Sequence, residues 1–295
     1  MNKLPEEQWI GHLREYCRAL NISTGDLYKI VTDLKVSPMI RGKAFEFSTY
    51  SRLKQILPAE EWTVTKPAMN AQTGTHDIDL MVKHNLTGKT ISVECKLAGK
   101  GKFRVAKKSQ AGVASRDDYL IGVKCMRSRT TKSLERVASA ARLFSVSPEA
   151  FLTHSDQYRA SSFNVVATSI GNAFYETLED EDGNLMYKFQ PTEAGKKFIK
   201  RLNPPVDNEI ALQEFVYNKV YFVSSLDIAV SSKSGVVCNR RNCLDKSDCG
   251  FIPNYPVINF GNITELSPDL IPSPKNHWIE IERVEQFFKE VLERI

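Results

Sequence analysis

The stretch GTHDIDLMVKHNLTGKTISVECKL, residues 74–97, places charges inside two apolar runs and decides the fold of this chain. Successive side chains of a β-strand point to opposite faces, so residues two apart share a face. The first run thereby places Asp77 and Asp79 on one face, and the second places Glu94 and Lys96 on one face. The turn-rich segment between the runs favours an antiparallel hairpin. The two charged faces are therefore expected to meet over a small area.

Such a group of carboxylates and one ammonium allows two interpretations. The face could lie open to solvent, with each acid neutralised by a nearby lysine. Alternatively, the carboxylates could share a hard divalent cation such as Mg²⁺, which prefers oxygen ligands. A cation held there can activate water and stabilise the charge that develops on a phosphate during hydrolysis. The metal site is favoured by the combination of an aspartate that enters an apolar strand from a turn, a short hairpin, and the sequence Val-Glu-Cys-Lys-Leu.

The segments around the hairpin predict an α/β unit over residues 41–126. Apolar spacing predicts helices over residues 4–20, 23–34, 41–57, 130–144 and 147–161. Strands are predicted at residues 61–66, 76–82, 89–97 and 118–126. The basic stretch of residues 98–115 is expected to form a loop that leads into a helix. The fold class is therefore α/β (or α+β), with a mixed sheet flanked by helices.

The second half of the chain predicts an α+β extension. Residues 173–202 suggest a strand, an acidic Asp-Gly turn, a second strand and a helix, either as a winged-helix module or as a hairpin against a helix. A further strand-like segment and a terminal helix are expected at residues 219–230 and 277–295. We expect an N-terminal helical segment, a core and a C-terminal α+β region, at residues 1–40, 41–160 and 161–295.

The hairpin resembles the PD-(D/E)XK nuclease superfamily in its acidic and basic residues. Asp79 or Asp77 would be the aspartate of the motif, with Asp79 preferred and Asp77 auxiliary, and Glu94-Cys95-Lys96 would be its (D/E)-x-K. The residue before the aspartate is His or Ile in this chain, where the family name has Pro. The resemblance covers roughly residues 41–126 and implies a restriction-endonuclease-like core that cleaves DNA.

The resemblance also implies roles for residues around the motif. Asp79, Glu94 and the Cys95 carbonyl would bind Mg²⁺, and Lys96 would position or deprotonate the attacking water or neutralise the phosphate. Glu46 in RGKAFEFSTYSRL, residues 41–53, stands where many members have a helical glutamate that completes the metal shell. A solvent-facing helical glutamate is the alternative at that position.

Basic residues that follow the motif are candidates for contact with DNA phosphates. The polar candidate near the site is Gln110, and the cysteine-containing loop adds two arginines. The predicted DNA-binding residues are Lys100, Lys102, Arg104, Lys107, Lys108, Gln110, Arg240 and Arg241.

Half of the six cysteines lie in one short loop, at Cys238, Cys243 and Cys249. They could be three unligated thiols, or they could bind a structural zinc ion or an iron–sulfur cluster. The fourth ligand is not evident from the spacing, and His277 or Cys17 could serve.

Composition restricts the class of protein. A chain of 295 residues with a net charge of +5 can bind a polyanion, and no apolar run reaches the ~20 residues that span a bilayer. A signal peptide is not expected, so the protein is predicted to be cytoplasmic. We predict a Mg²⁺-dependent type II restriction endonuclease that binds double-stranded DNA as a homodimer and leaves 5′-phosphate and 3′-hydroxyl ends. The alternatives are a repair or junction-resolving nuclease of the same superfamily and a non-catalytic DNA-binding protein.

Overall fold

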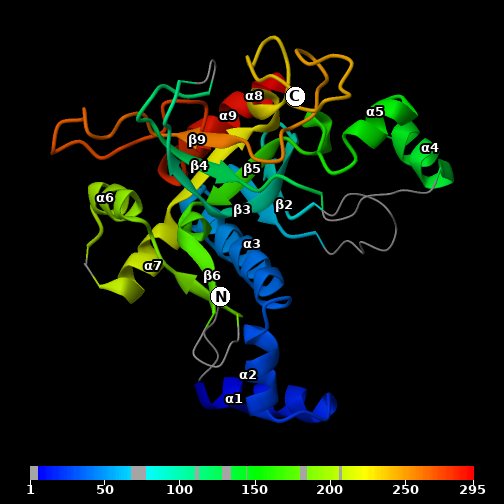
Figure 1. Ribbon diagram of the computed structural model, residues 1–295. Coiled ribbons are helices and arrows are strands. Elements are labelled where there is room, and N and C mark those ends of the chain that lie inside the picture. Colours follow the sequence, from blue (N-terminus) through cyan, green and yellow to red (C-terminus); the bar gives the residue numbers. More distant parts are fainter. Residues whose placement is uncertain are drawn as a thin grey trace. The chain divides into compact units, whose positions relative to one another are not determined.

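A computed structural model describes most of the chain (Figure 1). The described residues are 6–67, 78–109, 113–127, 134–143, 145–179, 185–205 and 208–295. The chain divides into two compact units, which are Met1–Ala44 with Thr177–Tyr187 and Phe45–Glu176 with Lys188–Ile295. Apart from Cys17, all candidate site residues that are described lie in the second unit.

The first unit is mainly helical. It contains α1 (Glu6–Ala19), α2 (Thr24–Thr32) and the start of α3 (Ser37–Ile56), which continues into the second unit. Helix α2 begins where it does because the Ser23 hydroxyl accepts from the Asp26 N–H, while the Asp26 carboxylate accepts from the Ser23 N–H. The three predicted N-terminal helices are thus present.

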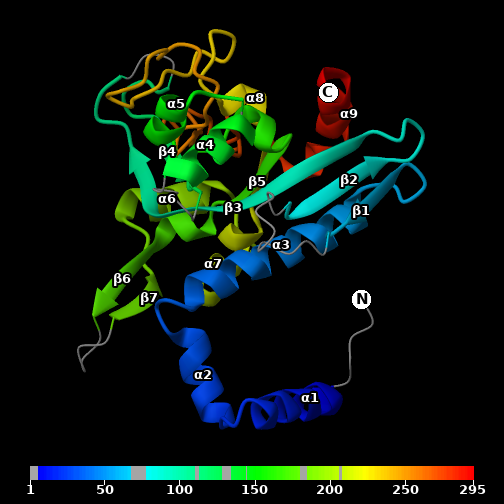
Figure 2. The same cartoon turned by 90° about the vertical axis from the view of Figure 1, so that its right-hand side faces the viewer.

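The second unit is built on a mixed eight-stranded sheet (Figure 2). Six strands follow one another in the order β1 (Trp62–Thr65), β2 (Leu80–His84), β3 (Thr90–Val105), β5 (Val165–Ser169), β8 (Val220–Ser224) and β10 (Ile279–Glu280). Strand β4 (Tyr119–Val123) pairs with the second half of β3, and β9 (Val257–Asn259) pairs with β4. The β3–β5 pair is parallel and the other pairs are antiparallel. The coarse prediction of a mixed sheet flanked by helices is therefore confirmed.

Alternation along the strands separates two apolar clusters. On β3, Ile91, Val93 and Cys95 face a cluster completed by α3 and by α9 (Val284–Arg294). The opposite face of the sheet packs against a second cluster that includes Val166 of β5 and residues of β4 and of α6 (Glu193–Arg201). Glu94 and Lys96 alternate with Cys95, so their side chains leave β3 on the face opposite the first cluster.

The predicted loop after the lysine motif is replaced by strand, and no helix follows it among the described residues 106–109 and 113–115. Strand β3 continues to Val105, and its register with β4 shifts between Ala98 and Phe103. Gly101 lies in this irregular segment with a φ of +62°, a conformation that favours glycine. Phe103 and Val105 pack against the second cluster. Their alternation with basic residues is the feature of the sequence that indicates a strand here.

The remaining helices surround these layers. They are α4 (Leu134–Leu143), α5 (Pro148–Thr153), α7 (Glu209–Asn218), α8 (Ser225–Ile228) and the 3₁₀ helices Ala160–Ser162, Gly171–Phe174 and Ile281–Arg283. Strands β6 (Tyr175–Glu179) and β7 (Leu185–Phe189) form a separate two-stranded sheet before α6, as the sequence predicts. The terminal helix starts at Val284 and not at 277, because β10 and a 3₁₀ turn precede it. Among the described helices, none combines the length and apolar character needed to cross a bilayer.

Candidate functional site

The start of strand β2 brings Asp79 beside the strand that carries Glu94. The antiparallel register pairs Leu80 with Val93, so one further residue places Asp79 opposite Glu94. Oδ2 of Asp79 accepts a hydrogen bond from the Cys95 backbone N–H at 2.8 Å, which fixes the Asp79 side chain against β3. The antiparallel hairpin predicted from the sequence is therefore present, and it brings the two acids together.

Glu94 is buried and its two oxygens differ in their surroundings. Its Oε1 lies 2.5 Å from the Lys96 ammonium and accepts a hydrogen bond from the Tyr158 hydroxyl at 3.1 Å. The Lys96 nitrogen also lies 5.2 Å from the centre of the Tyr158 ring. Within the described part of the chain, neither Oε2 of Glu94 nor Oδ1 of Asp79 makes a hydrogen bond. These two oxygens are the ones left for a cation.

Glu46 of α3 is the third carboxylate of the group. It is buried, and its Oε2 lies 2.5 Å from the Lys66 ammonium at the end of β1. Lys66 also lies over the Phe47 ring, at 4.9 Å from its centre. Lys66 was not among the predicted site residues, although it continues the alternation of the buried Trp62 and Val64 on β1.

The electrostatics show that Glu94 and Glu46 both act on Asp79. Burial, Glu94 and Glu46 together raise the pKa of Asp79 to about 7, against the opposing effects of Lys96 and the Cys95 N–H. Burial acts to lower the pKa of Lys96, but Glu94 and Tyr158 raise it well above its ordinary value. Among the described residues, Lys96 pairs with Glu94 and Lys66 pairs with Glu46, whereas Asp79 has no ion pair of its own.

Asp79→Asn is expected to stabilise the metal-free protein more at pH 8 than at pH 5. The folded pKa of Asp79, about 7, lies above its ordinary value of 3.8, so the folded state binds the proton more tightly. Ionising Asp79 therefore costs stability as the pH rises from about 4, and this cost is complete above about 7. The gain from Asn should be larger at pH 8 by about 1–3 kcal/mol.

Thermal or urea unfolding in EDTA at both pH values measures this difference. Asp269→Asn, at an exposed position, is the matched control and should show no pH-dependent gain. An equal effect of Asp79→Asn at pH 5 and pH 8 would contradict the raised pKa.

The predicted DNA-binding lysines and arginines of residues 100–108 are all exposed. Lys100, Lys102 and Arg104 stand on the distal half of β3, and Lys102 also lies over the ring of Tyr255 at 5.0 Å. Between Lys96 and Lys102 the strand includes the irregular segment around Gly101, so these residues do not form one straight extended run. The basic strip is still a continuation of the strand that carries the acidic site. Two further predicted residues, Asp77 and Gln110, lie outside the described residues.

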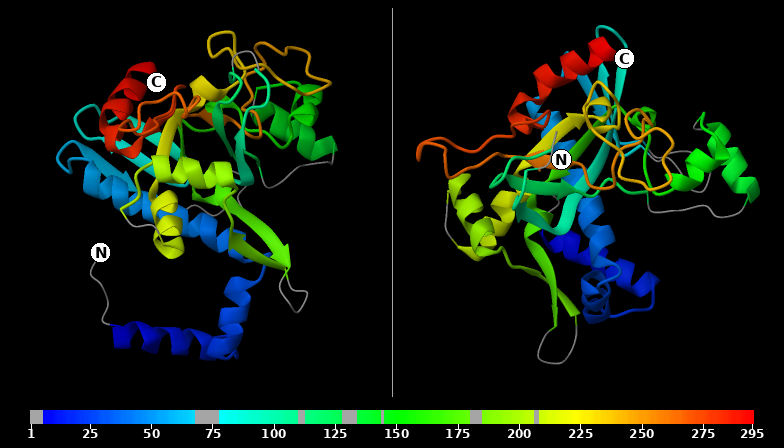
Figure 3. Two further views of the ribbon diagram at one scale, coloured as in Figure 1. Left: turned by 60° about the vertical axis from the view of Figure 1, so that its left-hand side comes forward. Right: turned by 45° about the horizontal axis from the view of Figure 1, so that its top comes forward.

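The three cysteines of the long loop after α8 gather around His154, which directly follows α5. The ligand atoms of His154, Cys238, Cys243 and Cys249 all lie within 4.8 Å of one another, so they could hold a metal ion. Figures 1 and 3 show the loop, in yellow to orange, beside α5. The fourth residue of this cluster is thus His154, and the expectation of His277 or Cys17 was wrong.

The two arginines of the cysteine loop have different surroundings. Nη2 of Arg240 lies 2.6 Å from each carboxylate oxygen of Asp156. The Arg240 side chain therefore makes an ion pair within the protein. Asn254 donates to the same Asp156 carboxylate at 2.7 Å. Arg241 is exposed and stays a predicted DNA contact.

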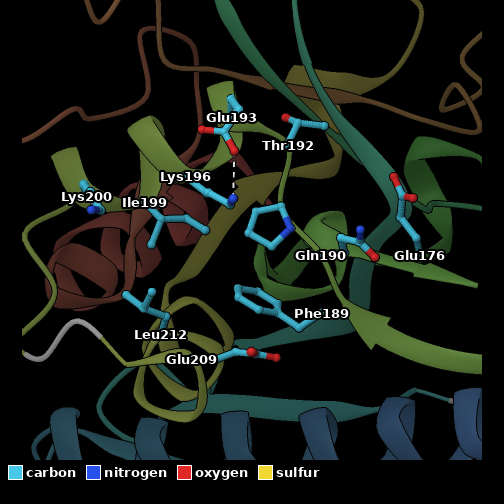
Figure 4. A pocket seen from close by; sticks show the side chains of 11 residues that line it. Glu176, Phe189, Gln190, Thr192, Glu193, Lys196, Ile199, Lys200, Glu209 and Leu212 are labelled. Atoms are coloured by element: carbon cyan, nitrogen blue, oxygen red, sulfur yellow. Dashed lines mark hydrogen bonds and ion pairs between the residues drawn. The ribbon is translucent and has the colours of Figure 1, made fainter. Parts of the chain in front are cut away.

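A cavity of about 540 Å³ lies between β7, α6 and α7, away from the carboxylates (Figure 4). Phe189, Ile199 and Leu212 supply apolar walls. At its rim, Glu193 pairs with Lys196 at 2.7 Å. The cavity contains none of the predicted site residues, and its mixed lining does not indicate a reaction.

No known protein family, curated protein or solved structure matches this chain. The function therefore has to be inferred from the side chains that the fold brings together. These are the carboxylates with Lys96, the adjoining basic strip and the cluster of His154 with three cysteines.

Proposed function

We propose that this protein is a Mg²⁺-dependent endonuclease that cleaves double-stranded DNA. The observation that carries the proposal is the convergence of Asp79, Glu94 and Glu46 beside Lys96. A solvated face of paired charges would need a cation for each acid. Instead, among the described residues Asp79 has no ion pair of its own, and neither Oδ1 of Asp79 nor Oε2 of Glu94 accepts a hydrogen bond.

The donor set fits a hard divalent cation. Oδ1 of Asp79 and Oε2 of Glu94 would hold Mg²⁺, with Glu46 and the Cys95 carbonyl as further candidates from the resemblance. When bound, the ion would supply Lewis acidity that lowers the pKa of a water molecule and offsets phosphate charge. The Cys₃His cluster has the wrong donors for Mg²⁺ and fits zinc instead.

Lys96 is suited to hold charge and position water in this proposal. Its raised pKa keeps the ammonium protonated, so it would donate hydrogen bonds to the attacking water or to a phosphate oxygen. In the hydrolysis, the water oxygen forms a bond to phosphorus and the bond from phosphorus to O3′ breaks. The water loses a proton and O3′ gains one, which leaves 5′-phosphate and 3′-hydroxyl ends.

The order of elements supports the resemblance to the PD-(D/E)XK superfamily. A helix that carries Glu46 precedes three antiparallel strands, and β5 then returns parallel to β3. The long C-terminal region, the modest net charge and a sequence without helicase motifs favour a type II restriction enzyme. A homodimer would place two such sites on the two strands of a palindrome.

The basic strip on β3 would contact the DNA backbone next to the cleavage site. Arg104→Gln is therefore expected to weaken DNA binding about 3–10-fold at 0.1 M salt and to reduce the salt slope of log K by about one. Fluorescence anisotropy with a labelled duplex in Ca²⁺, measured over a salt series, gives both quantities. Lys54→Gln, an exposed change on α3, serves as the control. An unchanged salt slope for Arg104→Gln would remove the strip from the DNA interface.

The proposal is tested by incubating the purified chain with supercoiled plasmid and phage DNA in Mg²⁺, and again with EDTA. Cleavage in Mg²⁺ that EDTA abolishes is expected, and discrete fragments would indicate site specificity. A smear of fragments of all lengths would support a non-specific nuclease and would contradict the restriction enzyme. The nuclease proposal would be overturned if several DNAs of different sequence stayed intact with enzyme in excess over DNA, in Mg²⁺ and also in Mn²⁺.

A further inference from the structure

A short segment, from His154 to Tyr158, connects the Cys₃His cluster to the acidic site. We infer that His154, Cys238, Cys243 and Cys249 bind one structural zinc ion, and that this ion positions the Tyr158 hydroxyl on Glu94. The effect on cleavage rests on the proposed function, whereas zinc binding and its effect on the segment do not.

The geometry fits a single tetrahedral ion. With Zn–S bonds of about 2.3 Å, tetrahedral ligand atoms lie about 3.8 Å apart. The four ligand atoms here lie within 4.8 Å of one another, which suits one ion and leaves little room for a multi-iron cluster. Three thiolates and one imidazole also form a closed ligand set of the structural type. Zinc therefore fits this cluster better than an iron–sulfur centre does.

Hydrogen bonds orient the histidine for a metal. The Gln157 side-chain nitrogen donates to the Ile252 carbonyl at 2.9 Å, which turns its Oε1 toward His154. Nδ1 of His154 lies 2.6 Å from that oxygen, so Nδ1 carries the proton and Nε2 is left as the ligand. The His154 ring is further fixed by stacking on Phe251, with 4.2 Å between ring centres.

Contacts of Arg240 in the cysteine loop also support metal binding by the cluster. The Arg240 N–H lies 3.4 Å from the Cys238 sulfur, a backbone contact that stabilises a thiolate. The Arg240 side chain pairs with Asp156, two residues beyond His154. One arginine thereby connects a ligand of the loop to the segment that supplies the histidine.

The segment from His154 to Tyr158 connects this cluster to the carboxylates. The Ile252 N–H donates to the Tyr158 carbonyl at 2.8 Å, and Ile252 lies three residues after Cys249. The Tyr158 hydroxyl donates to Oε1 of Glu94 at 3.1 Å. Tyr158 is thus held at its backbone by Ile252, three residues after the proposed ligand Cys249, and at its hydroxyl by Glu94. Its hydrogen bond occupies Oε1, which keeps Oε2 of Glu94 for the proposed Mg²⁺.

Metal analysis of the full chain tests the zinc site. We expect about one zinc and almost no iron per chain, and tetrahedral cobalt–thiolate absorption after exchange with Co²⁺. Cys243→Ser should lose the metal, whereas the matched Cys17→Ser, in helix α1, should keep it. If Cys243→Ser does not fold, Gln157→Leu retains all four ligands and should lower zinc affinity about 10–100-fold in chelator competition. Iron with sulfide, a disulfide among the three cysteines, or three free thiols without zinc would overturn the assignment.

Hydrogen exchange without DNA tests the positioning role. Zinc removal should increase exchange at the amides of Gln157 and Ile252, while amides in β2 stay protected. Tyr158→Phe should keep its zinc, lower Mg²⁺-dependent cleavage about 3–10-fold and shift its pH profile. Unchanged exchange after zinc removal would overturn the positioning role and leave the nuclease proposal intact. Full zinc occupancy with the expected exchange but no cleavage would instead count against the nuclease alone.

Discussion

Replacing Glu94 by Gln is expected to lower Mg²⁺-dependent DNA cleavage by about 10³-fold or more. The substitution removes the charged oxygen that would bind the ion, and loss of such electrostatic stabilisation costs about 4 kcal/mol in the transition state. The fold should tolerate the change, because Gln keeps the volume and the oxygen that accepts from the Tyr158 hydroxyl. Removing one of three neighbouring negative charges also relieves repulsion on Asp79.

The measurement is the single-turnover rate of plasmid nicking with enzyme in excess over DNA. Glu60→Gln, an exposed glutamate in the turn before β1, is the matched control and should cut at the parent rate. Circular dichroism and the unfolding midpoint establish that Glu94→Gln is folded. A folded Glu94→Gln protein that nicks plasmid at the parent rate would remove Glu94 from the metal site.

Replacing Lys96 by Met is the second change with a large expected effect. Met keeps most of the apolar stem and removes the ammonium, so cleavage should fall about 10²–10³-fold. DNA binding should change less than threefold, because Lys96 is only one of many cations near the backbone. The pKa of Asp79 should rise further, because Lys96 is the first group that opposes its increase.

This variant separates an enzyme from a non-catalytic DNA-binding protein. Nicking rates and anisotropy titrations are measured on the same preparation, with Lys83→Met, an exposed lysine of β2, as the control. An enzyme loses cleavage in Lys96→Met and retains binding. A parallel loss of cleavage and binding would show that Lys96 acts as a DNA contact and not at the reaction centre.

The sequence by itself determined the hairpin and its register. Alternation of apolar and charged residues in β2 and β3 allows one pairing that buries Leu80, Val82, Ile91 and Val93, since a one-residue slip would turn every side chain to the other face. That register places Asp79 opposite Glu94. Local periodicity also located helix α3, because its apolar positions recur at helical spacing around Phe45 and Leu53.

The tertiary structure decided which distant residues complete each site. Lys66 reaches Glu46, Tyr158 reaches Glu94, and His154 joins cysteines that lie more than 80 residues further along the chain. Strand β3 extends to Val105 because β4 supplies its partner there, which overrides the expectation of a loop in this segment. Local alternation fixes the face on which a side chain lies, but contacts between remote segments depend on how whole strands and loops pack together, and a linear pattern does not encode that packing in any single stretch.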